Sequence, residues 1–404
     1  MHVRIALVAA SAVASLALVP GVATASATGV AASCDHQWQV VPSYDHSEQY
    51  GEVDTLSGVT ALSSTDQWAV GSWEKYPNDY HFHTLIEHWD GSAAGWNVVP
   101  SPNPPVDSAL SGVAAVSTND AWAVGGASFE PYHSIVEHWD GNSWSIDYPA
   151  SFPGVLYGVT ALGPDNIWAV GTRDFPGPML IEHWDGTSWT ASYPLVHAHY
   201  GARLLGLTAL GPRNIWTVGY YWDAAGIEHT LAMHFNGQSW RQVKTPSPLT
   251  AFEGDQNWLT SVTAAGPNDV WAVGFSKGEE SQTSGTAGNT LIEHWNGARW
   301  SVVPSPNPAS TDGNALWGVS AVSAGDVWAV GNVGGVLDTF TSTTPLVAHW
   351  DGTTWTQVSA PGSGGLSGVA AEPGGAGISA VGNADKPASP FDYQGTLAQH
   401  SCPA

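Results

Sequence analysis

The sequence predicts an all-β fold, a seven-bladed β-propeller of four-stranded antiparallel blades, and three observations predict it. A Trp-(Ala/Thr)-Val-Gly segment recurs along the chain. Each copy lies in the same succession of short apolar segments and tight turns, and the last copy lacks a strand that the N-terminus can supply. The composition agrees, because 22 Trp and 46 Gly among 404 residues are typical of many short strands joined by turns.

The N-terminus reads as a signal peptide over residues 1–27. Arg4 precedes a mainly apolar stretch from Ile5 to Val19, and small residues then lead to an Ala25-Ser26-Ala27 cleavage site. The stretch is short for a membrane span, and no stop-transfer segment follows it. We therefore expect a secreted, extracellular protein without a membrane span, in which residues 28–404 form a single domain.

The repeat appears in copies spaced by about 50 residues, a length that suits a four-stranded blade. A degenerate copy spans Ser379 to Gly382. The six regular copies begin at Trp68, Trp122, Trp168, Trp216, Trp271 and Trp328.

Each unit reads as four strands. In the first unit, an apolar segment at 56–62 is followed by a short turn, the 68–71 segment, a variable loop and a third segment at 85–89. An Asp-Gly turn then leads to a last strand that Trp96 opens. A sheet of this size cannot bury both of its faces alone, so we expect the faces to stack on neighbouring blades, with Trp side chains supplying much of the buried area.

The outer strand of the last blade is missing at the C-terminus. The other units end in Trp-led strands, whereas the seventh ends at 397–400 without one. The missing copy lies at the other end of the chain, where residues 38–43 resemble 300–305. We therefore expect the last blade to be shared between residues 34–43 and 365–404, with 38–41 paired to 396–400.

The two cysteines fall on either side of this expected closure. Cys34 precedes the N-terminal strand and Cys402 follows the last C-terminal strand. An exported protein retains disulfides, so a Cys34–Cys402 bond is predicted. The alternative for Cys34 is a lipoprotein box at 31–34, although its residue three before the cysteine is Ala and the apolar run ends well upstream.

These units resemble kelch-type propeller repeats, including the central propeller of galactose oxidase-like proteins. The resemblance rests on a strand ending in Val-Gly, a variable loop, an aromatic-Asp-Gly turn and a Trp a few residues later. It covers the whole mature chain. Kelch units usually carry a Gly-Gly doublet, and at or near the Val-Gly strand end one is found here only at 125–126 and 334–335. The resemblance implies the architecture and says little about activity, because propellers host many functions.

Residues that recur in the blades are expected to build the scaffold. One histidine per blade would lie around a ring, too far from the others to share a metal ion, so we expect each to be satisfied at the same contact between blades. These are His88, His138, His183, His234, His294, His349 and His400. Six Asp or Asn residues two positions before the second-strand Trp are expected to cap turns: Asp66, Asp120, Asn166, Asn214, Asp269 and Asp326.

Function is expected where the repeat varies, on the face that carries the loops after the second strands and the connections between blades. Aromatic rings with polar edges suit sugars, which stack on rings and bond to carboxylates and imidazoles. The alternative is that these rings only anchor long loops. The candidate ligand-binding rings and imidazoles are Trp73, Tyr76, Tyr80, His81, His83, Tyr132, His133, Tyr157, Tyr221, Trp222, His229, Trp258 and Trp317. Tyr157 and Trp317 replace Ser or Thr on the innermost strand and are expected at the channel mouth.

Four acidic residues, Asp54, Asp107, Asp255 and Asp312, precede the innermost strands. Such carboxylates could hold Ca²⁺, bind sugar hydroxyls or act as a pair in glycoside cleavage, or they could be merely solvated. No cofactor is predicted, and calcium remains open.

The net charge and the motifs of the sequence exclude several classes of function. A formal charge of −25 argues against nucleic acid and anionic lipid as partners, which require a basic stripe. His-Glu-x-x-His, Gly-x-Ser-x-Gly and phosphate-loop motifs are absent from the sequence. We therefore expect a monomeric, non-catalytic binding propeller with lectin-like recognition of a glycan or a cell-surface component. A carboxylate-based glycoside hydrolase or lyase, or a scaffold for an extracellular protein, is the alternative.

Overall fold

The computed structural model describes residues 37–45, 53–74, 81–127, 133–147, 153–173, 177–196, 198–278, 288–308, 310, 313–334, 343–375, 377–385 and 394–401. The chain divides into two compact units, Met1–Ser33 and Cys34–Ala404. The expected signal peptide lies outside the described residues, and everything below concerns the second unit by itself.

The described residues form antiparallel four-stranded units, which we call blades and name by their first strand. The β2 blade contains β2 (Asp54–Ser63), β3 (Asp66–Glu74), β4 (Phe82–Trp89) and β5 (Asn97–Val98). The β6 blade contains β6 (Ser108–Ser117), β7 (Asp120–Ala127), β8 (His133–Trp139) and β9 (Trp144–Ile146). The β10 blade contains β10 (Val155–Gly163), β11 (Asn166–Thr172), β12 (Met179–Trp184) and β13 (Trp189–Ser192).

The remaining blades follow the same order. The β14 blade contains β14 (Ala202–Gly211), β15 (Asn214–Trp222), β16 (Glu228–Phe235) and β17 (Trp240–Val243). The β18 blade contains β18 (Gln256–Gly266), β19 (Asp269–Lys277), β20 (Asn289–Trp295) and β21 (Trp300–Val303). The β22 blade contains β22 (Asn314–Ser323), β23 (Asp326–Val333), β24 (Thr344–Trp350) and β25 (Trp355–Val358). The β26 blade contains β26 (Gly365–Ala371), β27 (Ile378–Asp385), β28 (Gln394–Ser401) and β1 (Trp38–Val41).

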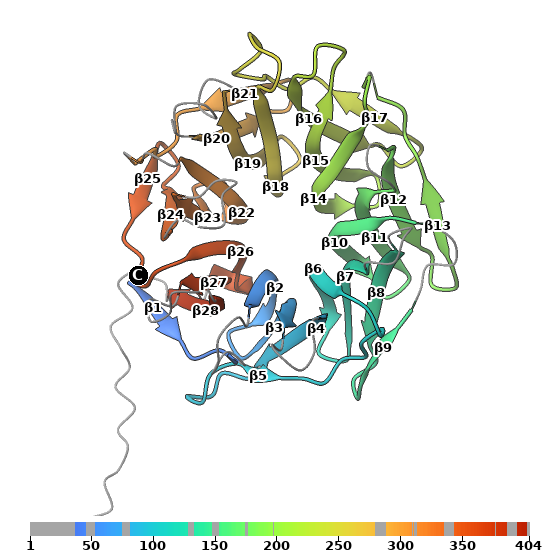
Figure 1. Cartoon of the computed structure of the whole chain (residues 1–404), viewed down its shortest axis with the longest axis vertical. Helices are drawn as coiled ribbons and strands as arrows, with labels where there is room; N and C mark the ends of the chain where they lie inside the picture. The colour runs from blue at the N-terminus through green and yellow to red at the C-terminus, as the bar shows by residue number, and fades with distance from the viewer. Residues whose placement is uncertain are drawn as a thin grey trace, which may run out of the picture. The chain divides into compact units, whose positions relative to one another are not determined.

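The fold is all-β, since the described residues hold strands and one short 3₁₀ turn, η1 (Pro373–Gly375). Each first strand contacts the first strand of the next blade, from β2 through β26, and β26 contacts β2 (Figure 1). The β14 and β18 blades are joined into one eight-stranded sheet by a single parallel pair, Glu228 with Gln256. No helix among the described residues is long and apolar enough to cross a membrane.

The N- and C-terminal strands meet in the β26 blade, as the sequence predicts. β1 pairs with β28 in antiparallel register, from Trp38 opposite Ser401 to Val41 opposite Ala398. The predicted pairing is confirmed, with its partner strand extending one residue beyond the expected end at His400. Cys34 and Cys402 lie outside the described residues, so their disulfide remains a prediction.

The core lies between the blades. Second-strand Trp side chains are buried, and most of them pack on two aromatic rings of the next blade. Trp168 packs on Phe235 and Trp240, and Trp328 packs on Trp38. Trp68 lies 5.1 Å from Trp139 and 5.2 Å from Trp144, measured between ring centroids. Such pairs contribute about 1 kcal/mol each beyond the burial of their area. The expected stacking of blade faces through Trp is therefore present.

The repeated histidines are satisfied, but within their own blades. His88 Nε2 is hydrogen-bonded to Asp66 Oδ1 at 2.8 Å, and its ring lies on Trp68, which is opposite it on β3. The expectation of a contact between blades is wrong because the imidazole lies beside its direct cross-strand neighbours. The same bond joins His138 to Asp120, His183 to Asn166, His234 to Asn214, His294 to Asp269, His349 to Asp326 and His400 to Glu372. The Asp and Asn side chains expected as turn caps therefore bind these histidines instead.

Four third strands carry a buried glutamate at the same place, one residue before the histidine. Burial raises the pKa of Glu87 and of Glu137 to about 8 and that of Glu182 to about 7, and it raises the pKa of Glu293 well above its usual range. The hydroxyl of Thr84, in the preceding blade, partly offsets this effect at Glu137. Glu87, Glu137 and Glu293 are therefore mainly protonated at neutral pH, whereas Glu182 titrates close to it.

Candidate functional site

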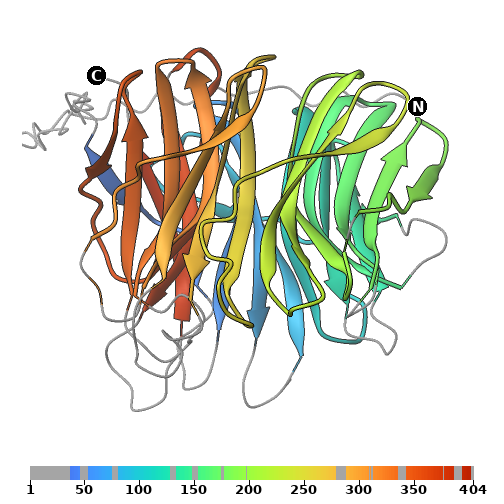
Figure 2. The same cartoon turned by 90° about the horizontal axis from the view of Figure 1, so that it is seen from above.

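The ends of the strands gather on two opposite faces of the blades, which Figure 2 shows edge-on. Because neighbouring strands are antiparallel, second strands end and third strands begin on the same face. First strands begin there too. We call it the variable face, and it is the face on which the sequence places the candidate site.

Glu228 lies at the centre of a cluster on the variable face, where the β14 and β18 blades join. Trp222 Nε1 donates a hydrogen bond to Glu228 Oε1 at 3.0 Å, and Trp258 Nε1 donates to Oε2. The Trp258 ring is stacked on Tyr220 with centroids 4.2 Å apart and planes 3° from parallel. We call Arg203, Tyr220, Trp222, Glu228 and Trp258 the Glu228 cluster. Two blades thus fix two indole rings about one carboxyl group.

The titration of this cluster is shifted by burial. Burial raises the pKa of Glu228, although hydrogen bonds from Trp258, Trp222 and Gln256 and the charge of Arg203 act against it. Burial also raises the pKa of Tyr220 above its usual range, and the Arg203 charge opposes that shift. The Tyr220 hydroxyl therefore remains protonated at neutral pH, and the Glu228 carboxyl holds its proton to a higher pH than an exposed glutamate.

The aromatic packing continues beyond Trp258 into the next blade. Phe275 is fully buried, and its centroid lies 5.1 Å from that of Trp258 and 5.7 Å from that of Trp317. Trp317 Nε1 donates to Asn332 Oδ1 at 2.5 Å. The rings of the β14, β18 and β22 blades therefore form one continuous group.

Side chains at equivalent positions of the first strands differ in size from blade to blade. Arg203 and Trp258 stand at the position where three other blades carry small side chains. Cross-strand pairing identifies the equivalent residues of the β2, β6 and β26 blades as Thr55, Ala109 and Gly365. Tyr157, half-buried, occupies a β-bulge between Leu156 and Gly158 in β10. Large rings therefore stand on one side of the channel mouth and small residues on the other.

An aromatic ring stacked on a histidine occurs at the same place in two blades. Trp73 is stacked on His83 with centroids 4.6 Å apart, and Tyr221 is stacked on His229 with centroids 5.1 Å apart. Each ring lies opposite its imidazole at the end of the second strand. Tyr221 and Trp222 are consecutive in a strand, so their side chains point to opposite faces of the sheet. The structure therefore places these two predicted site residues on different sides of the β14 blade.

The described acidic candidates contact residues close to them. Asp255 is buried and accepts hydrogen bonds from the backbone N–H groups of Ala251 and Phe252, at 2.9 and 3.0 Å. Asp54 is also buried, and it lies opposite Trp73 on β3. A solvated state is therefore wrong for both. Asp107 accepts from the backbone N–H of Phe82 at 3.1 Å and is hydrogen-bonded to His81 at 3.0 Å.

The candidates do not converge on a single point. His133 is exposed at the start of β8, on another blade from the Glu228 cluster. Tyr76, Tyr80, Tyr132 and Asp312 lie outside the described residues. Within the described part of the chain, no three His, Cys, Asp or Glu side chains come close enough to hold a metal ion.

Sequence reasoning missed Arg203 and Glu228. Arg203 stands where other blades carry Thr, Val or Ala, and this departure from the repeat was the available indication. Glu228 opens β16 directly after a variable loop, and only its contacts with rings from two blades give it significance.

No protein-family model and no curated protein matches this sequence. Solved structures do match. YCF48 from Cyanidioschyzon merolae is 14% identical, with 91% of this chain and 99% of that chain covered and a TM-score of 0.54. YCF48 bound to D1 peptide is 15% identical, with 91% and 97% covered and a TM-score of 0.53.

A polysaccharide lyase of family PL25, an ulvan lyase bound to -[GlcA(1-4)Rha3S]-, is 9% identical, with 86% of this chain and 94% of that chain covered and a TM-score of 0.56. The fold is that of a β-propeller. At such identities the likeness shows the fold alone, and it does not confirm the resemblance to kelch-type repeats.

Proposed function

We propose that this chain is a secreted, non-catalytic, lectin-like protein that binds a glycan through the variable face, at the Glu228 cluster and the neighbouring Trp317. We also propose that its four-stranded blades number seven, that Cys34 and Cys402 close the ring, and that the protein works as an extracellular monomer. The proposal requires no cofactor.

The observation that carries the proposal is the fixed pairing of indole rings with a carboxyl group. Trp222 and Trp258 are half-buried and held at their ring nitrogens by Glu228. A sugar presents apolar C–H faces and hydroxyl edges, so it requires rings and hydrogen-bonding groups at fixed positions side by side. The small residues opposite leave room for a ligand at the channel mouth.

The two kinds of structural neighbour bear on the partner class. The ulvan lyase structure holds a bound saccharide, and a YCF48 structure holds a bound D1 peptide. Taken together, the two neighbours show that a propeller can bind either a saccharide or a peptide. For this chain the ring-and-carboxyl arrangement favours the glycan, and a peptide or an extracellular protein is the alternative outcome of the test.

The test is a glycan-binding screen followed by calorimetry with the best ligand. Trp258→Ala and Trp317→Ala should each weaken binding, and the Tyr157→Ala, Trp317→Ala double variant should weaken it by about tenfold or more, because each stacked ring contributes about 1 kcal/mol. Trp139→Ala, a half-buried scaffold ring on the β6 blade, is the control: it should lower the melting temperature and retain affinity. Unchanged binding in the double variant would overturn this placement, and cleavage of the glycan would assign the protein to the enzymes.

A further inference from the structure

A separate set of cavities opens along the connection between the β10 and β14 blades. Three cavities of about 730, 500 and 370 Å³ share Leu195 in their linings. Leu195 is 95% exposed, although it is a large apolar residue. Pro194 lines two of the cavities and Trp240 also lines two, so the three form neighbouring parts of one groove. We call it the seam groove.

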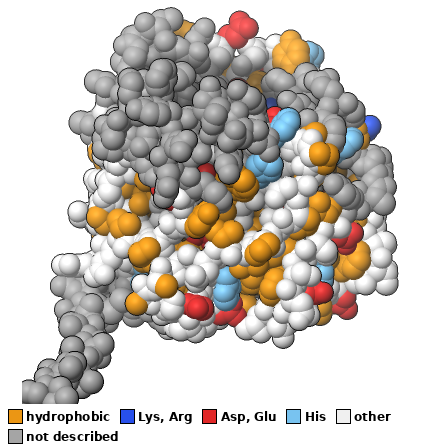
Figure 3. Space-filling view, turned by 60° about the horizontal axis from the view of Figure 1, so that its bottom comes forward, with side chains coloured by type: hydrophobic (Ala, Val, Ile, Leu, Met, Phe, Trp, Pro, Cys, Tyr) orange, Lys and Arg blue, Asp and Glu red, His pale blue; other side chains and the backbone are white. Residues whose placement is uncertain are grey.

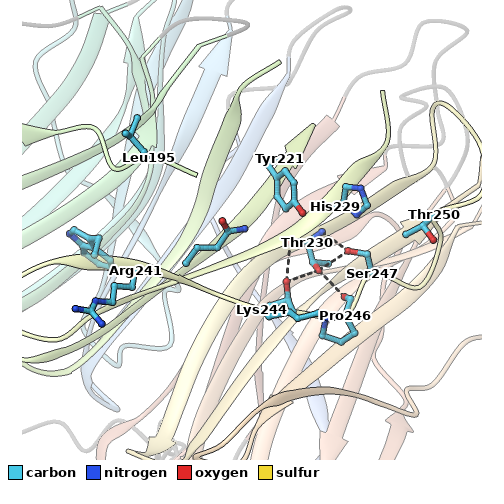
Figure 4. A pocket seen from close by; sticks show the side chains of 12 residues that line it. Leu195, Tyr221, His229, Thr230, Arg241, Lys244, Pro246, Ser247 and Thr250 are labelled. Atoms are coloured by element: carbon cyan, nitrogen blue, oxygen red, sulfur yellow. Dashed lines mark hydrogen bonds between the residues drawn. The ribbon is translucent and has the colours of Figure 1, made fainter. Parts of the chain in front are cut away.

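The largest cavity is lined by groups with hydrogen-bonding capacity (Figure 4). In this view Leu195 and Arg241 lie toward one end, and Tyr221, His229 and Ser247 lie toward the other. The Tyr221 ring is stacked on His229, whose Nε2 is hydrogen-bonded to Asp223 at 2.9 Å. These contacts fix the orientation of both rings, and their size and polar edges suit a sugar.

The side of the cavity next to these rings is stabilised by hydrogen bonds among hydroxyl groups. Thr230 Oγ1 donates to the carbonyl of Pro246 at 2.7 Å, and it lies 2.9 Å from Thr245 Oγ1 and 3.1 Å from Ser247 Oγ. This network joins the start of β16 to the segment that follows β17. The largest cavity is therefore built on ordered strands and their hydrogen-bonded connection.

The charge of the largest cavity is opposite to that of the chain. Its lining includes Arg241 and Lys244 and contains no Asp or Glu, although the chain has 35 acidic and 10 basic residues. Lys244 directly follows the end of β17 and lines the cavity together with Trp240 and Gln242 of that strand. Arg241 lines the same cavity and adds a second positive charge. Figure 3, by contrast, shows a face with very little Lys or Arg.

We propose that the seam groove is a second carbohydrate site, which binds an oligosaccharide that carries an acidic group. The ammonium group of Lys244 pairs with the carboxylate or sulfate of the sugar, and the sugar ring lies beside Tyr221 and His229. A neighbouring sugar unit extends past Leu195 toward Trp240. This site is separate from the Glu228 cluster and does not depend on it.

The test uses the mature protein and calorimetry with four probes: oligogalacturonate, a sulfated galactan oligosaccharide, neutral dextran oligosaccharide and poly-glutamate. Lys244→Gln should weaken binding of at least one acidic saccharide by about tenfold, since charge-assisted hydrogen bonds are the stronger ones. Tyr221→Ala should weaken the same binding. Both saccharide arms are needed, because a carboxylate and a sulfate offer the same charge.

Arg299→Gln removes an exposed cation on the β18 blade, outside the seam groove, and is the matched control that should leave binding unchanged. The proposal is overturned if neither acidic saccharide binds, if Lys244→Gln binds as tightly as the parent, or if poly-glutamate binds as tightly as the saccharides. Trp258→Ala should not affect this binding, so failure of the seam groove and failure of the Glu228 cluster are distinguishable.

Discussion

The side-chain amide of Gln67 donates a hydrogen bond of 2.7 Å to Glu372, a residue 305 positions away in the sequence. Glu372 Oε1 is also hydrogen-bonded to His400 at 2.9 Å, and both Gln67 and Glu372 are buried. Other second strands carry Ala, Ile or Val where Gln67 stands. The junction between the first and last blades is thus held by a buried polar bond, whereas the other junctions are apolar at this point.

Gln67→Ala should therefore destabilise the protein by about 1–3 kcal/mol, because Glu372 would lose a donor while buried. The free energy of unfolding in urea is the measurement. Gln357→Ala, at an exposed position of β25, should change it by less than about 0.5 kcal/mol. Equal effects of the two substitutions would show that the Gln67 bond contributes nothing to the junction.

The buried glutamates predict that stability falls as the pH rises. Burial raises the pKa of Glu137 from 4.5 to about 8, so the folded protein holds a proton that the unfolded chain has released. This contribution is fully present below pH 4.5 and is lost as the pH rises through 8. Urea unfolding between pH 5 and 9 should show the decline.

Glu137→Gln should flatten that decline, by up to about 1.4 kcal/mol per pH unit for one group. Glu253→Gln, at an exposed position, is the matched control and should leave the slope unchanged. A parent protein whose stability is constant over this range would contradict the assignment of neutral buried acids.

His183→Ala should lower the melting temperature and leave glycan affinity intact. His183 binds Asn166 at 2.9 Å and stacks on Trp168, and all three groups belong to the scaffold of the β10 blade. The loss should be about 1–2 kcal/mol. Calorimetry on the folded variant gives the affinity, and weakened binding at unchanged stability would place His183 in a site instead.

Glu228→Gln should weaken glycan binding by about tenfold. One glutamine oxygen replaces two carboxylate acceptors, so either Trp222 or Trp258 would face an amide NH₂ and turn away. Binding by the parent should also fall on acidification, because protonating Glu228 removes an acceptor, and its raised pKa moves this loss to a higher pH than for an exposed glutamate. Affinity that does not change between pH 4 and 7 would contradict this role.

The disulfide prediction is tested by thiol counting on the unfolded protein. A Cys34–Cys402 bond gives no free thiol without reductant, and its reduction should lower stability by up to about 5 kcal/mol. Free thiols in the freshly purified protein would show that the ring closes through the β1 and β28 strands alone.

The sequence predicted the blades because its repeat marks each strand with a Trp, a Gly or a turn. The pairing of Trp38 with β28 followed from one missing copy. The site was predicted less well, since Tyr221 and Trp222 are adjacent in sequence yet face different blades. The role of Glu228 depends on Trp258, 30 residues away, and no local pattern connects them.

The pairing of β1 with β28 has a consequence for the order in which the chain is made. During synthesis Trp38 emerges hundreds of residues before its partner Ser401. Until then, a nascent chain has a ring with one unfilled gap and an unpaired strand, which is an edge that other chains can join. The edge therefore stays open until β28 has been made, and a chain truncated before residue 394 cannot fill the gap.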